Sequence, residues 1–235
     1  MKALKTIKCI IGATALITAA SAQALVVDTS LWTTAASPAA NSGPTGLTSA
    51  GGNQAVQNSI SYGTIVSDFS FIGDFNFSGS MTPTTVSFND DDILGLVFGW
   101  QDASNHYRLG WEQGGYNDPA SGASGMFLVR ELAGVSTILF QQETFWADNV
   151  DYNFIVGRTG NDISFGLAGI SQSFTDTTFM SGNVGFYTES QTARFGGLAS
   201  APQAPGTGTV SEPAPFALIG LGLLGMLFAR KRSAA

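Results

Sequence analysis

Short runs of β-forming residues, separated by turn-forming Gly, Asn and Asp, fill the chain from residue 68 to residue 198. This region has no stretch of useful length with the 3.6-residue apolar periodicity of an amphipathic helix. Many short strands with turn signals between them predict an all-β sandwich or barrel. The expected strands are Phe69–Phe77, Ile93–Trp100, His106–Gln113, Met126–Glu131, Ser136–Phe140, Tyr152–Val156, Asp162–Leu167, Val184–Thr188 and Ala193–Leu198.

Two of these runs show how a strand lies in the predicted sheets. In His106–Gln113, Tyr107, Leu109 and Trp111 fall on one face and the polar side chains fall on the other. By contrast, Ile93–Trp100 is almost continuously apolar. An unbroken apolar run of this length predicts a central strand that is covered on both faces.

The segments around these strands define the domain limits. Residues 25–58 are rich in Ala, Ser, Thr, Gly and Asn, which predicts a loosely structured lead-in with one or two edge strands. We therefore expect one β domain over residues 25–198, long enough to bury a sizeable core. The Pro/Gly/Ala-rich residues 199–209 predict a flexible linker.

The N-terminus has the three parts of a secretory signal peptide over residues 1–24. Three lysines without an acidic residue precede an apolar stretch over residues 9–20, and Ala22 and Ala24 form an A-x-A cleavage site. The apolar stretch is shorter than the roughly 20 residues that span a bilayer, so an uncleaved anchor is the weaker alternative. These features predict export through the Sec machinery.

The C-terminus carries a second short apolar segment, between a Glu-Pro box and a basic cluster. Residues 216–229 contain no polar side chain, and with the residues just before them they predict a short transmembrane helix over residues 214–229. The basic cluster should stay cytoplasmic, which puts the body of the protein on the outer side. The residues that form the box and the cluster are Ser211, Glu212, Pro213, Arg230, Lys231 and Arg232.

This order of elements over residues 210–235 resembles a PEP-CTERM sorting signal. Ser211 stands where the first proline of the fullest pattern is found. The resemblance implies a Gram-negative bacterium, recognition by an exosortase and removal of the tail. It also implies a place in the cell envelope, at the surface or in an exopolysaccharide matrix.

The charge and the cysteine content of the region between the two ends exclude some partners. After the signal and the terminal basic cluster are set aside, four arginines face 17 acidic residues, a net charge of −13 without any lysine. Nucleic acid is therefore not an expected partner. Cys9, the one cysteine, lies in the signal, so the mature protein needs no disulfide or thiol chemistry.

An acidic triplet, Asp90, Asp91 and Asp92, stands directly before the apolar run, and Asp102 follows that run. Adjacent carboxylates repel one another unless water or a cation neutralises them. Ca²⁺ prefers about six to eight oxygen ligands, which carboxylates and backbone carbonyls supply. The residues alone leave two interpretations open, a calcium site and a solvated acidic turn.

The stretch from Asp90 to Gln113 resembles the C-terminal lectin-like domain of thrombospondins. The shared pattern is the acidic triplet, an apolar strand that ends in Phe98-Gly99-Trp100-Gln101-Asp102, and Trp111-Glu112-Gln113. The resemblance implies a concanavalin-like jelly-roll sandwich with bound Ca²⁺ that serves in adhesion and matrix contact. This chain lacks the disulfide of that family and its preceding calcium-binding repeats.

Aromatic residues near this stretch are candidates for contact with sugars. Trp100, Trp111 and Tyr116 could stack on sugar rings if they are exposed, although aromatic residues of a sandwich are more often buried.

Catalytic motifs are weak in this chain. His106 is the one histidine, which argues against a zinc site of the usual kind and suggests a surface position. No G-x-S-x-G motif is present. Glu112 and Glu131 could form a glycosidase pair, but two surface glutamates are the simpler interpretation.

The sequence therefore predicts an exported, non-catalytic protein with a calcium-dependent domain that binds glycan or matrix. A polysaccharide-acting enzyme and a purely structural matrix component are the alternatives.

Overall fold

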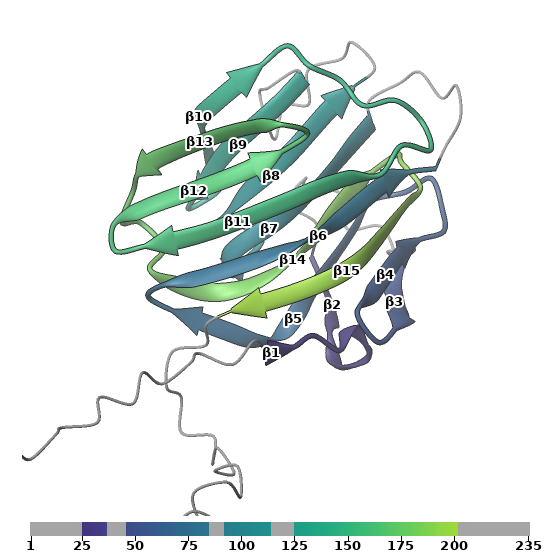
Figure 1. The fold of residues 1–235 in the computed structure, drawn as a ribbon, viewed down its shortest axis with the longest axis horizontal. Helices are drawn as coiled ribbons and strands as arrows, with labels where there is room; N and C mark the ends of the chain where they lie inside the picture. The colour runs from purple at the N-terminus through teal and green to yellow at the C-terminus, as the bar shows by residue number, and fades with distance from the viewer. Residues whose placement is uncertain (1–24, 37–45, 85–91, 114–124, 202–235) are drawn as a thin grey trace, which may run out of the picture. The chain divides into compact units, whose positions relative to one another are not determined.

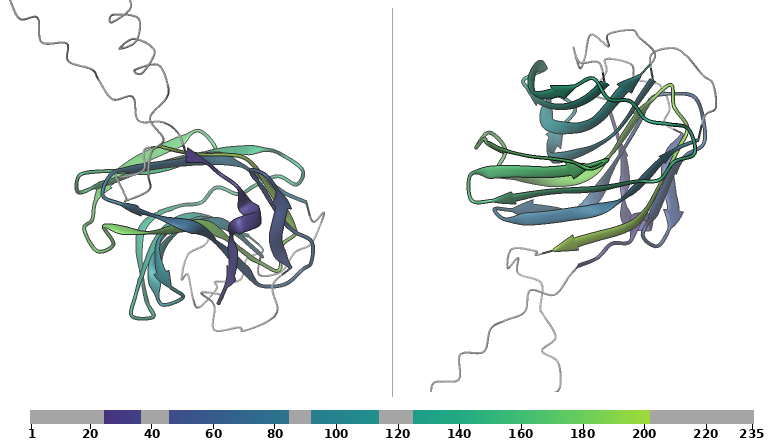
Figure 2. Two further views of the ribbon diagram at one scale, coloured as in Figure 1. Left: turned by 90° about the horizontal axis from the view of Figure 1, so that it is seen from below. Right: turned by 45° about the horizontal axis from the view of Figure 1, so that its top comes forward.

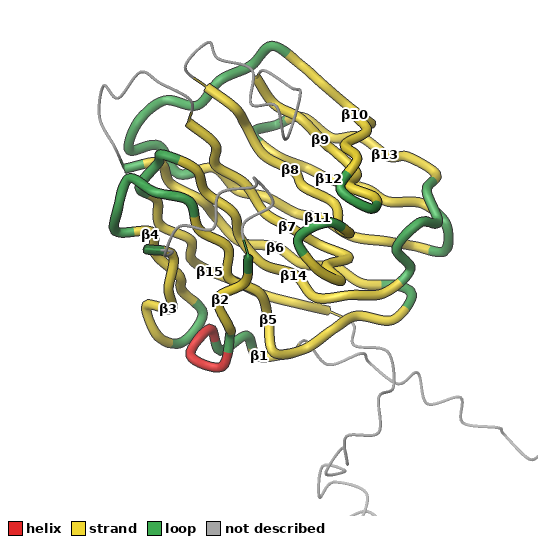
Figure 3. Tube along the Cα trace, turned by 180° about the vertical axis from the view of Figure 1, so that it is seen from behind, coloured by secondary structure: helices red, strands yellow, loops and turns green. Residues whose placement is uncertain are grey.

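The computed structural model describes residues 25–36, 46–84, 92–113 and 125–201. These residues form strands β1 to β15 and one 3-10 turn, Thr29–Leu31, shown in red in Figure 3. Within these ranges, no helix is long and apolar enough to cross a membrane. The predicted all-β class is confirmed.

The strands make two antiparallel sheets, which we call sheet A and sheet B. Sheet A contains, in spatial order, β13 (Ile170–Thr175), β12 (Asp162–Leu167), β11 (Tyr152–Thr159), β6 (Phe75–Pro83), β15 (Ala193–Ala201), β4 (Gln54–Gln57) and β3 (Leu47–Gly51), with β1 (Leu25–Val26) paired to β15. Sheet B contains β10 (Val135–Gln142), β9 (Gly125–Leu132), β8 (Asn105–Gln113), β7 (Asp92–Asp102), β14 (Ser181–Glu189), β5 (Gly63–Ile72) and β2 (Thr33–Ala35).

The two sheets lie face to face as a sandwich. Figure 1 shows sheet A in front of sheet B, and Figure 2 shows the two layers from other directions. Figure 3 presents sheet B from behind. Each sheet has an inner face, which contacts the core, and an outer face. The outer face of sheet A is turned toward the reader in Figure 1.

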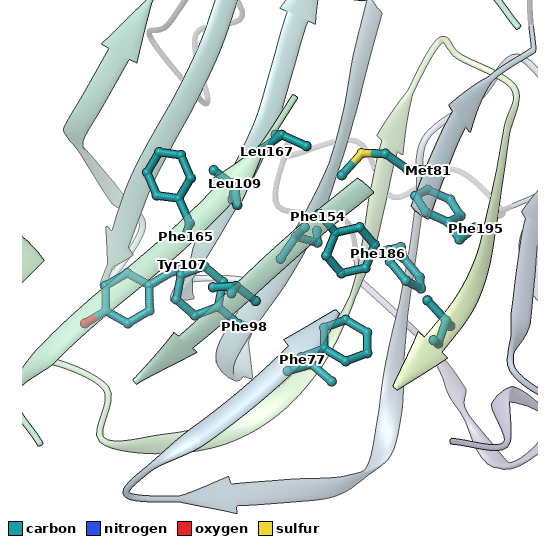
Figure 4. Close-up of a cluster of buried hydrophobic side chains, with 14 of the residues drawn as sticks. Phe77, Met81, Phe98, Tyr107, Leu109, Phe154, Phe165, Leu167, Phe186 and Phe195 are labelled. Carbon is teal, nitrogen blue, oxygen red and sulfur yellow. The ribbon is translucent and has the colours of Figure 1, made fainter. Parts of the chain in front are cut away.

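Alternating apolar side chains from both sheets fill the space between them (Figure 4). Phe77 of β6 and Phe154 of β11 lie with ring centroids 5.4 Å apart, and each ring centroid is 6.0 Å from that of Phe186 of β14. Such aromatic pairs contribute roughly 0.5–1.5 kcal/mol beyond the burial of their area. The core thus joins strands that are far apart in the sequence.

β7 occupies the middle of sheet B, between β8 and β14. Its residues 92–100 are all buried, which confirms the predicted central strand with both faces covered.

Two sequence predictions need correction. The run Phe69–Phe77 is a hairpin and not one strand, because Gly73 takes a left-handed φ of 75° between β5 and β6. The lead-in is more ordered than expected, because it contributes β1 to β4, and β4 pairs with both β3 and β15.

Candidate functional site

Several predicted site residues lie outside the described ranges, and their predictions stand untested by the geometry. These are Ala22, Ala24, Asp90, Asp91, Tyr116, Ser211, Glu212, Pro213, Arg230, Lys231 and Arg232, together with the predicted transmembrane segment 214–229.

The structure separates the two described members of the predicted metal site. Asp92 is the first residue of β7 and Asp102 is the last. At about 3.3 Å per residue, the two ends of this strand lie roughly 30 Å apart. One ion cannot bind both carboxylates, so Asp102 does not belong to a site with Asp92.

Asp102 has a structural role in the turn between β7 and β8. Its Oδ1 accepts hydrogen bonds from the Ser104 amide at 2.8 Å and from Asn105 Nδ2 at 2.9 Å. A carboxylate that accepts bonds from the residues just after it is typical of an Asx turn.

The predicted sugar-stacking tryptophans are both buried. Trp111 is 1% exposed and packs against Trp146 and Tyr152 in the core. Trp100 is 6% exposed, and its ring centroid lies 4.7 Å from that of His106. Neither ring presents a free face to a sugar.

The outer face of sheet B carries a second buried cluster, and this corrects three surface predictions. β8 does alternate as predicted, but His106, Arg108 and Glu112 on its outer face are at most 1% exposed, and Glu131 on β9 is 6% exposed. The buried apolar members of this cluster are Val66, Ile93, Val97, Trp100, Phe127, Val129 and Tyr187.

Charged side chains form a network inside this cluster. The Arg108 guanidinium lies 3.7 Å from Glu131 Oε2 and 5.5 Å from the centroid of the Tyr187 ring. The Tyr187 hydroxyl donates a hydrogen bond to Glu189. The register places Glu112 and Glu189 on either side of Ile93. A sugar could reach these groups only if the cluster opened.

Burial, together with the charge of Arg108, lowers the pKa of His106 to about 3, although a hydrogen bond to the Asp102 carbonyl acts in the opposite direction. Its Nδ1 lies 3.0 Å from that carbonyl. The imidazole is therefore neutral at physiological pH and is held as part of the cluster.

The proposed glycosidase pair does not have the required spacing. Glu112 lies opposite Gly125, and Glu131 lies opposite His106, six residues along β8. Six residues of strand extend about 20 Å. Paired glycosidase carboxyls lie roughly 5–9.5 Å apart.

The outer face of sheet A carries exposed side chains and is hollowed. Three adjacent hollows, which we call the outer groove, cross it. The first, of about 780 Å³, lies over β6, β11, β12 and β13. The middle one, of about 310 Å³, lies over β6, β11 and β15. The third, of about 340 Å³, lies over β3, β4, β6 and β15.

Strand register gives the first hollow a floor of small residues. One rung across four strands reads Asn76, Gly157, Ser164 and Ser173, and the next reads Ser78, Ile155, Gly166 and Ser171. A Cβ on Gly157 would lie 2.7 Å from the Phe75 carbonyl oxygen, and one on Gly166 would lie 2.9 Å from Ile155 Cγ2. The glycines therefore permit close packing and keep the floor low.

Polar side chains on this floor are available to a ligand. Asn76, Ser164, Ser171 and Ser173 are exposed. None of the four makes a side-chain hydrogen bond to another described residue. They offer hydroxyl and amide groups that both donate and accept hydrogen bonds.

The middle and third hollows share Ser80 and Gly196. Ser80 Oγ donates to the Gly196 carbonyl at 3.3 Å, and the ladder between β15 and β6 shifts register just after Gly196. A Cβ on Gly196 would meet nothing closer than 3.9 Å. The absence of a side chain there keeps the two hollows continuous.

Few charges line the outer groove, and they are of mixed sign. Asp74 and Arg158 line the first hollow, and Asp151 and Arg194 line the third. Arg158 is 2% exposed, and it donates to the carbonyls of Asp176 and Phe179. The surface that a ligand meets is thus close to neutral.

Sequence reasoning missed the outer groove. Its residues are single Ser, Asn and Gly positions on strands that are distant in the chain, and they form no motif. The available signal was the alternation of aromatic with small polar residues, as in Phe75–Ser80.

The PEP-CTERM protein-sorting motif matches residues 209–232. This match confirms the sorting motif predicted at the C-terminus, and it indicates an exported protein of a Gram-negative bacterium. A search of the curated proteins finds no relative of this chain.

Solved structures with the same fold include sugar-binding proteins. The carbohydrate-binding module CBM66 from Bacillus subtilis is 18% identical, with a TM-score of 0.55 over 75% of this chain and 97% of that one. The VIP36 exoplasmic/lumenal domain, in a form bound to Ca²⁺ and Man3GlcNAc, is 8% identical, with a TM-score of 0.52 over 77% and 88%.

A third similar structure is the CBM2 module of the evolved Dit protein of Lactobacillus casei BL23 phage J-1. It is 13% identical, with a TM-score of 0.51 over 77% of this chain and 96% of that one. At such identities the likeness concerns the fold, a lectin-like jelly-roll sandwich, which confirms the predicted fold class. The narrower resemblance to the thrombospondin domain stays a prediction.

Proposed function

We propose that the β-sandwich is a non-catalytic glycan-binding domain of an exported protein, and that glycans bind in the outer groove of sheet A. The observation that carries this proposal is the floor of the first hollow, where exposed Asn76, Ser164, Ser171 and Ser173 leave their hydroxyl and amide groups unused by the described residues. Sugars present the same donors and acceptors in return. The shared fold with carbohydrate-binding modules supports the proposal.

The non-catalytic part of the proposal rests on the carboxylates. The spacing of Glu112 and Glu131 is too wide for a glycosidase pair, and Glu112 and Glu189 are at most 2% exposed. Undiminished hydrolysis of the cell's own exopolysaccharide by a Glu112→Gln variant would remove Glu112 from any catalytic role. Loss of hydrolysis in that folded variant would favour the enzyme alternative.

Export and sorting complete the proposed role. The Sec machinery exports the chain, and an exosortase removes the tail after residues near Pro213. The acidic domain then remains in the envelope or the extracellular matrix and holds polysaccharide there. The domain limits predicted from the sequence, residues 25–198 with a linker over 199–209, belong to this proposal.

Calcium is a separate element of the proposal. The described residues contain no group of three or more His, Cys, Asp or Glu that could hold a metal, and they supply Asp92 alone from the acidic triplet. Binding therefore depends on Asp90 and Asp91 with backbone oxygens. Calorimetry with Ca²⁺ tests this element, and no heat at millimolar calcium with an unchanged Tm would remove it.

A paired variant tests the glycan site. Ser164→Leu places an apolar side chain on the floor of the first hollow, whereas Thr137→Leu changes an exposed residue of β10 in sheet B. On a glycan array, the wild type and Thr137→Leu should bind the same sugars, and Ser164→Leu should lose them. A blank array for the wild type, together with measured self-assembly, would favour a structural matrix component.

A further inference from the structure

We infer that the outer groove binds an internal stretch of a long, uncharged polysaccharide chain, laid across all three hollows, and not a chain end. This inference rests on the proposed glycan-binding function. Its support is the continuity, the open ends and the charge of the groove.

The three hollows form one path. The middle and third hollows share Ser80 and Gly196, and Ile155, which lines the first hollow, is the register partner of Ser78, which lines the middle one. From β13 to β4 the path crosses five neighbouring strand pairs in sheet A. At about 4.8 Å per pair this amounts to about 24 Å, which is long enough for several sugar rings.

Both ends of the path are open. The first hollow ends at β13, the edge strand of sheet A, where Ser171 and Ser173 are exposed. The third hollow ends over β4 and β3, where Gln54 and Ala50 are exposed. A site for a terminal sugar encloses the last ring, whereas neither of these ends has a described wall. A chain can therefore continue past both.

The contacts along the path are individually weak. Of the described residues that line the first hollow, the two aromatic ones, Phe75 and Phe165, are buried, and Ile155, 45% exposed, supplies the apolar contact. Most of the other exposed groups on the path are hydroxyls and amides, whose net hydrogen bonds are each worth roughly 0.5–1.5 kcal/mol. Useful affinity then requires several rings bound at once, so it should rise with chain length.

The charge of the groove selects for neutral chains. Asp74 and Asp151 are exposed at the two end hollows, against one exposed cation, Arg194. The exported body carries an excess of negative charge. An anionic polysaccharide would meet repulsion, and binding of a neutral one should depend little on salt.

Calorimetry of the full chain with defined oligosaccharides tests the inference. The probes are disaccharides and hexasaccharides of β-1,4-glucan, β-1,3-glucan, mannan and xylan, with oligoalginate as the anionic probe. At least one hexasaccharide should bind about tenfold or more tightly than its disaccharide, a difference of about 1.4 kcal/mol. Gly196→Leu, which fills the wall shared by the middle and third hollows, should abolish that advantage.

Thr137→Leu on sheet B serves as the matched control. If Gly196→Leu does not fold, Ser173→Leu at the open end of the first hollow takes its place. Equal affinity for disaccharide and hexasaccharide, or tighter binding of oligoalginate, would overturn the inference and leave glycan binding intact. No binding of any probe, together with a blank glycan array, would overturn the proposed function as well.

Discussion

His106 shows how a residue that looks functional in the sequence can be structural. It is the one histidine of the chain, it is fully buried, and its ring packs on Trp100. Its pKa of about 3 in the folded state lies below the ordinary value of 6.5. The neutral imidazole contributes to stability above pH 6.5, and this contribution is lost as the pH falls from 6.5 toward 3.

Two measurements check this account of His106. The imidazole NMR signals should not titrate between pH 5 and pH 8, because protonation would bury a charge. The contribution of His106 to the free energy of unfolding should fall by roughly 1.5 kcal/mol between pH 6.5 and pH 5, because the slope approaches about 1.36 kcal/mol per pH unit below pH 6.5. An NMR midpoint near 6.5 would mean that the ring is exposed in solution.

Replacement by alanine should have opposite effects on stability at two glycines, Gly110 and Gly196. A Cβ on Gly110 would lie 2.2 Å from the Leu94 carbonyl oxygen, a backbone atom that cannot easily move, whereas one on Gly196 has free space. Gly110→Ala should destabilise the protein by roughly 1–3 kcal/mol. Gly196→Ala should be neutral or stabilise it by about 0.4–1 kcal/mol, because the unfolded chain loses entropy. Urea unfolding distinguishes them, and equal losses would contradict the packing of β7 on β8.

At the scale of elements, the segment between β13 and β14 is held by the sandwich through Asp176. Asp176 Oδ1 accepts from the Tyr107 hydroxyl at 2.7 Å, and Oδ2 accepts from Arg130 at 2.8 Å. Burial raises the pKa of Asp176, but hydrogen bonds from Thr178 and Tyr107, with the charge of Arg130, outweigh it and lower the pKa. The ion pair therefore stabilises the fold above the ordinary Asp pKa and is lost as acid protonates Asp176.

Removal of the Tyr107 hydroxyl tests this attachment. Tyr107→Phe should destabilise the protein by roughly 1–3 kcal/mol, because the buried Asp176 carboxylate loses a donor. Tyr152→Phe is a useful comparison, since its hydroxyl accepts from the exposed Ala147 amide and its loss should cost less. Thermal unfolding of both variants at neutral pH gives the difference, and equal stabilities would contradict the proposed anchoring.

The elements themselves were largely predictable, because period-2 alternation and an apolar run mark β8 and β7 directly in the sequence. The hairpin at Gly73 was missed because apolar residues continue on both sides of the turn. β13 was not predicted, and β3 and β4 were expected only as one or two unplaced edge strands of the lead-in, because their residues are mostly small or polar and carry little apolar signal. These strands nevertheless form part of sheet A, where tertiary pairing outweighs weak local preference.

The outer groove was not predictable for a related reason. Asn76, Gly157, Ser164 and Ser173 become neighbours only through the register of four strands. The acidic triplet was predicted as a calcium site because adjacent like charges can be read directly from the sequence. The predicted strand Ile93–Trp100 already placed Asp92 and Asp102 at its two ends, so the length of that strand argued against one ion bound by both.

At the scale of the whole molecule, the two ends of the chain determine where the domain works. Mass spectrometry of the native protein should find a mature N-terminus at Leu25 and no residues beyond about Pro213, because a signal peptidase and an exosortase would have cut there. Intact Met1 and Ala235 in a protein recovered from the cytosol would contradict the export account.

The central claim, that the hollowed outer face of sheet A binds glycan, is tested most directly by NMR mapping. Amide signals of the isotope-labelled full chain are followed during titration with the hexasaccharide that binds best. The account predicts shifts at Asn76, Ile155, Ser164 and Gly196, with little change on sheet B. Shifts confined to sheet B or to the residues before β7, with an unchanged outer groove, would contradict it.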